Sequence, residues 1–418
     1  MKVIYNKQKH TLEWGLILLY VAAQISQISK LVLNIDFELT KIILFVAIML
    51  IIDWKYIFRL KLPTFDIYFG LLFIYQIYIV IIALLADIEV FQSNNGIIYT
   101  LFVIALIIAF SSNNKEIDGN FLASRFTIVL GVLNTVLFIY FMQNSSDMIY
   151  FTNYLNESGE MIADRATLAL GAYAYVIATL MDKIKKKIYV IFKYIFMIPV
   201  SFNIISTSRR GMMIAVIVIA CIHLVLAIKS NGGITRIRVK PKAWGMSILA
   251  ILICFILYLN NEFVNSEFDR FFNSINNAVV TFLGLGYDDM SGMERVSSRN
   301  DMLEEIEKFT LIEWLFGIGY NTKWIDFPFL QAIYDMGIIS AIMYFFLQTS
   351  GIINLLRCKH FSLNEADKFA LYFAILGYMN NFYSGTPYGI ARYMYIVLIY
   401  YLCIRAKKRN WLCRSDGL

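Results

Sequence analysis

Long apolar runs recur along this chain, and they restrict what it can fold into more than any other feature. The hydrocarbon core of a bilayer is about 30 Å thick, which an α-helix of roughly 20 apolar residues crosses. The 418-residue chain is 59% hydrophobic and only 16% charged, so we predict an all-α, polytopic helical membrane protein with a single transmembrane domain over 1–418. We count twelve apolar stretches, at 13–33, 40–58, 65–86, 96–111, 121–142, 165–181, 188–206, 211–228, 243–260, 328–350, 366–384 and 389–405.

Basic residues gather in alternate connections between these stretches, for example at 183–187, 229–242 and 405–409. The intervening connections, at 143–165 and 261–327, carry most of the acidic side chains. By the positive-inside rule, this pattern places both termini in the cytoplasm, and an even number of spans agrees with it. The net charge of +7 is therefore an orientation signal and does not indicate nucleic-acid binding. We expect the first apolar stretch to be an uncleaved span.

Two outer connections stand out by their length. The first covers 143–165, and the second, at 261–327, is the largest segment outside the predicted spans. Within the second, apolar residues recur at helical spacing between Arg299 and Phe309, which predicts a short amphipathic helix on the outer surface. Gly317 and Gly319 follow it and are expected to mark a turn, because no strand precedes them to make a nucleotide-binding motif.

Several classes of chemistry lack the residues they need on the outer side. The three histidines, His10, His223 and His360, are all predicted to lie in the cytoplasm or in a span leading away from the outer face. The chain has no Walker loop and no zinc-protease motif. Its five cysteines show no metal-ligand spacing and none lies in an outer loop, so we expect no disulfide, no metal and no cofactor.

Arginine is the residue that the predicted outer side does supply. Arg209 and Arg210 stand together in 206–211, between two apolar stretches, where two permanent cations are costly unless they hold an anion or line a wet cavity. Converging guanidinium groups at helix N-termini suit a diphosphate. A single arginine at the membrane rim also snorkels to lipid phosphates or pairs with a carboxylate. The other outer candidates are Arg165, Arg295, Arg299 and Arg392.

Carboxylates and aromatic rings complete the set of candidates. Asp335 lies in the tenth predicted span, where it must pair with an arginine or line a cavity, and Asp326 just before it could equally cap the helix. Either could activate a hydroxyl group, as could Asp164 or Glu160. Aromatic rings near the outer side suit stacking on sugar faces, although anchoring at the membrane rim explains them as well. They are Tyr287, Tyr320, Trp324, Tyr383 and Tyr388.

Three short patches of this sequence resemble the O-antigen polymerase (Wzy-type) branch of the bacterial polysaccharide polymerase and O-antigen ligase superfamily. The first is Asp164-Arg-Ala-Thr-Leu-Ala-Leu-Gly171, and the second is Ser206-Thr-Ser-Arg-Arg-Gly211. The third runs from Arg299 through Leu315-Phe-Gly-Ile-Gly319 to Gly337. The motifs are degenerate singly and moderately specific together, and the topology resembles the family over most of the chain.

The resemblance implies a GT-C-like fold and a metal-independent glycosyltransferase in the bacterial inner membrane. Such an enzyme transfers a glycan from undecaprenyl diphosphate onto a second lipid-linked repeat unit at the periplasmic face, with membrane lipids around it and a chain-length regulator as an expected partner. By this resemblance Arg165, Arg209, Arg210 and Arg392 would bind the diphosphate. The expected catalytic residues are Asp326, Arg299 and Asp335, and the expected sugar-binding residues are Tyr320, Trp324 and Tyr383.

Two alternatives remain open. A flippase for the same lipid-linked oligosaccharide would carry its charges deep within the spans and have short loops on both sides. An O-antigen ligase would carry a histidine shortly before Leu330, where this chain reads Trp324-Ile-Asp-Phe-Pro-Phe-Leu330. The charge at predicted helix ends and the long outer loop favour the polymerase.

Overall fold

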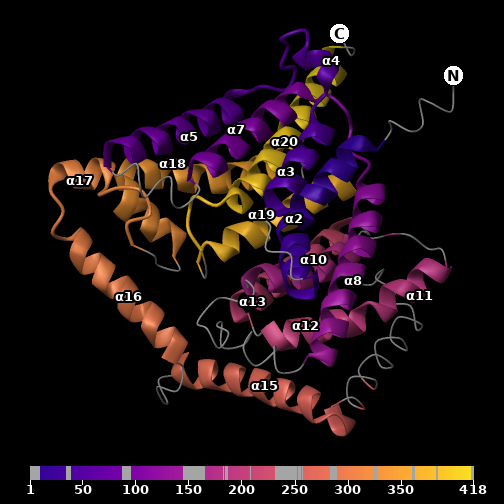
Figure 1. Ribbon diagram of the computed structural model, residues 1–418. Helices are drawn as coiled ribbons and strands as arrows, with labels where there is room; N and C mark the ends of the chain where they lie inside the picture. Colours follow the sequence, from indigo (N-terminus) through magenta and orange to yellow (C-terminus); the bar gives the residue numbers. More distant parts are fainter. Residues whose placement is uncertain are drawn as a thin grey trace. The chain divides into compact units, whose positions relative to one another are not determined.

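The computed structural model describes residues 10–33, 39–86, 96–144, 165–181, 183, 187–207, 209–230, 252, 256, 258–282, 290–323, 327–359, 363–382 and 385–415. Within these ranges the regular secondary structure is entirely helical (Figure 1). The helices are α2 (Thr11–Leu33), α3 (Leu39–Ile51), α4 (Trp54–Ile57), α5 (Ile67–Ala86), α7 (Gly96–Ser112), α8 (Gly119–Gln143), α10 (Arg165–Met181), α11 (Lys187–Ile195), α12 (Met197–Thr207), α13 (Arg210–Ser230), α15 (Glu262–Phe282), α16 (Met290–Ile306), α17 (Leu311–Phe316), α18 (Pro328–Lys359), α19 (Glu365–Asn380) and α20 (Ile390–Ser415).

Six helical segments are long and apolar enough to cross a membrane. They are Thr11–Leu33, Ile67–Leu85, Gly119–Gln143, Tyr189–Thr207, Arg210–Ile228 and Pro328–Arg357. Three shorter apolar helices, Leu39–Ile51, Gly96–Ser112 and Ala166–Met181, accompany them. The prediction of an all-helical chain with several membrane-spanning segments is confirmed to this extent. The number of twelve spans and their orientation stay predictions.

Two of the predicted spans have a different local structure from the one expected. The stretch 40–58 is not one helix, because α3 ends at Ile51 and Asp53 then caps α4 by accepting a hydrogen bond from the backbone N–H of Lys55 at 3.3 Å. The stretch 188–206 is divided into α11 and α12 by a turn at Phe196. The predicted span 243–260 lies largely outside the described residues.

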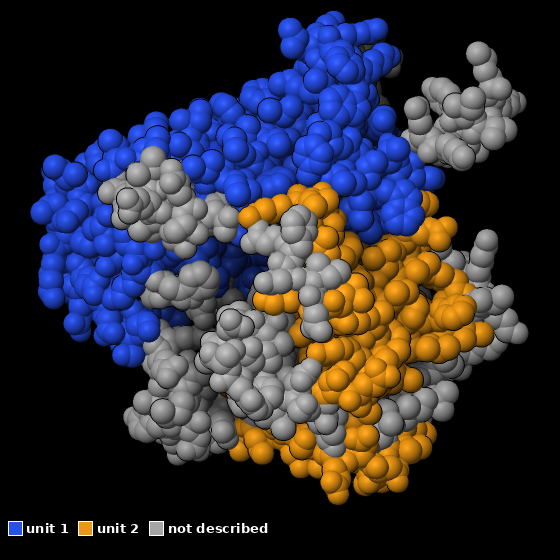
Figure 2. All heavy atoms as spheres, viewed as in Figure 1, with its two compact units in different colours: residues 1–19, 44–119, 291–418 blue, residues 20–43, 120–290 orange. Residues whose placement is uncertain are grey.

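The chain divides into two compact units (Figure 2). Unit 1 contains residues 1–19, 44–119 and 291–418, and unit 2 contains residues 20–43 and 120–290. In unit 1, α18 packs against α5, α17, α19 and α20, and Figure 1 shows α5, α7, α18 and α20 side by side. The core of this unit is rich in fully buried tyrosines: Tyr75, Tyr344, Tyr372, Tyr393, Tyr400 and Tyr401.

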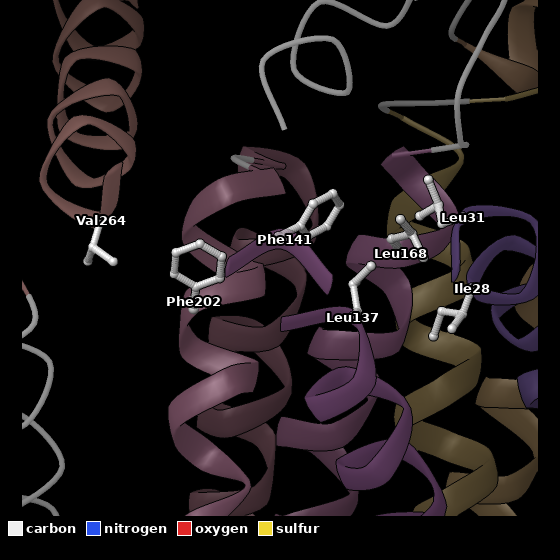
Figure 3. Packing of buried hydrophobic residues seen from close by; sticks show 7 residues of the cluster. All are labelled: Ile28, Leu31, Leu137, Phe141, Leu168, Phe202 and Val264. Carbon is white, nitrogen blue, oxygen red and sulfur yellow. The ribbon is translucent and has the colours of Figure 1, made fainter. Parts of the chain in front are cut away.

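Unit 2 is built on an apolar cluster to which α2, α8, α10, α12 and α15 contribute (Figure 3). The cluster consists of Ile28, Leu31, Leu137, Phe141, Leu168, Phe202 and Val264. An amide pair ties two of these helices together, because the side chain of Asn203 donates to the Asn134 side-chain oxygen and to its backbone carbonyl, both at 3.0 Å. Close helix approach through small residues and amide bonds is typical of packing within a membrane.

The segment 261–327 is more regular than the sequence indicated. We expected one short amphipathic helix over 299–309, whereas the structure forms α15, α16 and α17 in this segment. The expected apolar face is present at the end of α16, where Met302 and Ile306 are buried against Leu330 and Tyr334 of α18. The prediction missed α15, although Val264, Phe268 and Phe271 of this helix recur at helical spacing among its polar residues.

Candidate functional site

The candidate site in unit 1 is built around a break in α18 at Gly337. This glycine has φ 75° and ψ 177°, a conformation essentially closed to other residues, so the helix cannot continue through it regularly. The break releases backbone carbonyls that need partners inside an apolar bundle. Ile318 N–H donates to the Tyr334 carbonyl at 3.1 Å, and Gly319 N–H donates to that of Asp335 at 2.9 Å. The Tyr78 hydroxyl donates to the carbonyl of Met336 at 2.9 Å.

Asp335 lies two residues before this break and is completely buried. Its carboxylate accepts hydrogen bonds from the Thr322 hydroxyl at 2.9 Å, from the Thr322 backbone N–H at 3.3 Å and from the Tyr388 hydroxyl at 2.9 Å. We expected this residue to pair with an arginine or to line a cavity. The partners that the structure describes are instead hydroxyl and amide donors, which solvate the carboxylate without a permanent cation.

Tyr320 and Tyr388 form the wall beside this carboxylate. Their ring centroids are 4.3 Å apart, and only 3% and 5% of their surfaces are exposed. Burial raises the pKa of the Tyr388 hydroxyl well above its ordinary value, so this group stays protonated and acts as a hydrogen-bond donor. Burial likewise raises the pKa of Tyr320. The role of Tyr320 in sugar binding stays a prediction, and in this structure its ring packs on Tyr388.

The turn before α20 contains Tyr388 and also the residues that contact Arg392. Arg392 is 7% exposed, and its Nε donates to the carbonyl of Thr386 at 3.3 Å. Gly385 has φ 79°, and a β-carbon there would lie 2.6 Å from the Arg392 guanidinium. This glycine therefore makes room for the cation, which lies in the first turn of α20 as the sequence predicted.

Arg299 lies on α16 in the same unit. Its guanidinium carbon is 4.8 Å from the centroid of the Phe327 ring, just before α18 begins. A guanidinium on an aromatic face is a stabilising contact, and it joins the middle of α16 to the residue just before α18. The structure therefore assigns Arg299 a packing contact, and its catalytic role stays a prediction.

The arginine pair lies in unit 2, at the junction of α12 and α13. Arg210 is the first residue of α13, and both side chains are partly buried. The backbone carbonyl of Arg209 accepts a hydrogen bond from the Tyr173 hydroxyl at 3.3 Å. Beside them, Arg270 of α15 donates to the Ser206 carbonyl at the end of α12 and to Glu267, both at 2.5 Å. Arg270 is a further cation at this junction that the sequence did not single out.

The structure thus groups only part of the predicted site. Arg299, Asp335, Tyr320 and Arg392 belong to unit 1, whereas Arg209 and Arg210 belong to unit 2. Arg165 begins α10, but its side chain lies outside the described part of the structure, as does that of Arg295. Asp164, Glu160, Tyr287, Trp324, Asp326 and Tyr383 also lie outside the described residues.

Sequence reasoning missed the residues that hold Asp335. Thr322 is one of many threonines, and Tyr388 was considered only as an aromatic near the outer side. A comparison of the chain with protein-family models finds no match, and no curated protein matches it either.

Proposed function

We propose that the chain is a membrane-embedded glycosyltransferase that polymerises lipid-linked oligosaccharide repeat units into O-antigen or a related surface polysaccharide. In this proposal it acts in the bacterial inner membrane, at the periplasmic face, with undecaprenyl-diphosphate-linked oligosaccharide as both donor and acceptor. The observation that carries the proposal is the buried carboxylate of Asp335, which a broken helix and two hydroxyl donors hold within an apolar unit.

The surroundings of Asp335 suit the handling of a hydroxyl group. A carboxylate that already accepts bonds from the hydroxyls of Thr322 and Tyr388 can accept one from a sugar hydroxyl in the same way. In the proposed reaction, Asp335 or Asp326 orients or deprotonates the acceptor hydroxyl, and arginines neutralise the charge on the departing diphosphate. Arg392, in the first turn of α20, supplies a buried cation in the same unit.

A second candidate, a flippase for the same lipid-linked oligosaccharide, is favoured by one observation. Interrupted helices with a carboxylate near the break are typical of transporter binding sites, and α18 with Asp335 and Gly337 has this form. The two candidates differ in their product, because a polymerase lengthens the glycan and releases undecaprenyl diphosphate. A flippase moves the same lipid between leaflets without chemical change.

The test uses the purified full-length protein in liposomes with an undecaprenyl-diphosphate-linked repeat unit. We expect a ladder of lengthened glycans from the wild-type protein, and loss of that ladder in Asp335→Asn and Arg210→Ala. Matched controls are Asp301→Asn and Arg357→Ala, because both side chains are exposed. These controls should retain the ladder.

Normal chain lengths from both Asp335→Asn and Arg210→Ala would overturn the roles proposed for these two residues. Transfer of a fluorescent lipid-linked oligosaccharide between leaflets, without any longer product, would replace the polymerase by the flippase. Variants are compared only after their elution in detergent matches that of the wild-type protein.

A further inference from the structure

The buried face of α18 in unit 1 carries polar as well as apolar side chains, whereas its exposed face is apolar, unlike the exposed face of a helix in a water-soluble protein. Ser340, Tyr344, Gln348 and Ser350 are all buried. The opposite face consists of large exposed apolar side chains: Ile339, Ile342, Phe345, Phe346 and Ile353. In a membrane-spanning segment, polar groups placed inward in this way either form hydrogen bonds between packed helices or line a path for ions or substrate.

The polar side chains on this face of α18 form hydrogen bonds with the neighbouring helices. The hydroxyls of Tyr75 and Ser340 lie 3.2 Å apart, and the hydroxyl of Tyr344 donates to the Asn381 side-chain oxygen at 2.6 Å. Farther along, the hydroxyls of Ser350 and Tyr400 lie 2.9 Å apart. We call this series of contacts the polar column. It begins at Asp335 and ends at Asn354.

The column reaches from the break in α18 almost to the end of that helix. The side chain of Asn354 donates to the Tyr68 hydroxyl at 2.7 Å, and Lys407 lies over the Tyr68 ring at 4.8 Å. At about 1.5 Å of rise per residue, Ser340 and Asn354 are roughly 20 Å apart along the helix. With Asp335 added beyond the break, the column covers most of a hydrocarbon core of about 30 Å.

Unsatisfied donors interrupt the column at three places. The side-chain nitrogens of Gln76, Gln348 and Asn381 are buried and have no hydrogen-bond partner among the described residues. Gln76 is 2% exposed, Gln348 is 6% exposed and Asn381 is 0% exposed. Gln76 has a side-chain contact with the Tyr393 hydroxyl, Gln348 has one with the Tyr344 hydroxyl, and the Asn381 oxygen accepts a hydrogen bond from Tyr344, so all three amides belong to the column.

Buried amide groups left without partners cost free energy, and ordered water is the usual partner that restores their bonds. Each amide is next to a tyrosine hydroxyl, so a water molecule there would bridge two polar groups. Chains of water and hydroxyl groups carry protons, because each oxygen accepts one proton and passes on another. No bond other than O–H forms or breaks in this process.

We propose that unit 1 holds a water-filled, proton-conducting column that connects Asp335 with the far end of α18 near Asn354. A proton entering at Tyr68 displaces a proton at each hydroxyl and water oxygen in turn, and Tyr388 passes one to the carboxylate of Asp335. This carboxylate then releases its proton to water beside the exposed residue Thr322. The titratable or charged groups that face the column are Asp335, Tyr320, Tyr388, Arg392, Tyr75, Tyr78, Tyr344, Tyr393, Tyr400, Tyr68 and Lys407.

The test measures protons directly and requires no glycan substrate. The full-length protein is reconstituted in liposomes that contain a pH-sensitive dye, and a potassium gradient with valinomycin drives protons inward. We expect acidification faster than in protein-free liposomes. Gln348→Leu, Tyr344→Phe and Ser340→Ala should each reduce it to the protein-free rate, whereas Ile342→Leu on the exposed face should retain the wild-type rate.

A proton flux through the wild-type protein equal to that of protein-free liposomes, with a normal response to an added uncoupler, would overturn the proposal that the column conducts protons. The same conclusion follows if the three column variants conduct as the wild-type protein does. Ser340→Ala is the smallest change, and it keeps the test decisive if Gln348→Leu does not elute as a folded protein. Because glycan chemistry plays no part, the outcome is independent of the proposed polymerase activity.

Radiolytic labelling provides a second measurement on the same protein. Water held beside a buried side chain promotes its oxidation, so Tyr344 should be oxidised much faster than Tyr175, which is equally buried but lies outside the column. Equal and slow oxidation of both tyrosines would show that the column is dry.

Discussion

The backbone around Gly317 and the backbone around Gly337 lie in direct contact, and each glycine faces the segment that contains the other. A β-carbon on Gly317 would be 2.3 Å from the carbonyl of Asp335, and a β-carbon on Gly337 would be 2.2 Å from that of Leu315. Both glycines have φ 75°, with ψ near 180°. The contact brings the loop after α17 to the break in α18, where its N–H groups reach the carbonyls of Tyr334 and Asp335.

Replacing either glycine should separate the loop from the break. We expect Gly337→Ala or Gly317→Ala to destabilise unit 1 by about 1–3 kcal/mol from backbone strain alone, and further because the contact has no space for a methyl group. Thermal unfolding in detergent, followed by the fluorescence of the purified protein, measures this loss.

Gly389→Ala is the matched control for this pair. A β-carbon at Gly389 meets no atom within 4 Å, so this variant should unfold at the wild-type temperature. Equal stability of the Gly337→Ala and Gly389→Ala proteins would contradict the contact described above.

The Tyr388→Phe variant isolates one donor to Asp335. It removes a buried hydroxyl that donates at 2.9 Å and leaves the ring that packs on Tyr320 in place. Loss of a buried hydrogen bond to a carboxylate costs about 1–3 kcal/mol. We expect a lower unfolding temperature and, under the proposed function, shorter glycan chains. In the Asp335→Asn background the same substitution should cost less, because the acceptor is no longer a carboxylate, and additive effects would refute the coupling.

The positions of several apolar helices could be predicted closely from the sequence. The predicted stretch 96–111 corresponds to α7, which covers Gly96–Ser112, and 165–181 coincides with α10. Hydropathy succeeds here because a continuous apolar run is a local property. The buried carboxylate was also identified, since an Asp within an apolar run is visible without any knowledge of its partners.

The partners of that carboxylate were not predictable in the same way. Thr322 and Tyr388 reach Asp335 from a loop and from the turn before α20, and no local pattern indicates such a contact. The polar face of α18 did leave a signal, because Ser340, Tyr344 and Gln348 are spaced by four residues, which places them on one side of a helix. Reading the segment only for its hydrophobicity concealed this pattern.

The Arg270 side chain should control how firmly α15 is attached to α12 within unit 2. It joins Glu267, whose side chain is only 9% exposed, to the carbonyl of Ser206 at the end of α12. Arg270→Met leaves this carboxylate without its cation, so we expect faster hydrogen exchange throughout α15. Because the Arg270 side chain is 33% exposed, the loss of stability should be smaller than the 3–5 kcal/mol typical of breaking a fully buried ion pair.

Adding Glu267→Gln to Arg270→Met should restore part of the protection, since no unpaired charge then remains. Glu262→Gln, an exposed acidic residue in the first turn of the same helix, is the control and should exchange at the wild-type rate. Wild-type exchange in the Arg270→Met protein would show that the pair contributes nothing to the attachment.

The end of α16 should loosen from α18 in acid. Lys323 donates to Glu305 at 2.8 Å and the Tyr334 hydroxyl donates to it as well, and these bonds hold the pKa of the Glu305 carboxyl below its ordinary value of 4.5. A carboxyl whose pKa is lower in the folded state stabilises that state above about pH 4.5. The stabilisation is lost as the pH falls from there through the folded pKa. Hydrogen exchange of residues 302–309 should therefore accelerate below pH 4.5 in the wild-type protein.

In Glu305→Gln the exchange, corrected for its intrinsic pH dependence, should be faster at neutral pH and should not change further in acid. An acid response that persists in this variant would assign the effect to another carboxyl group.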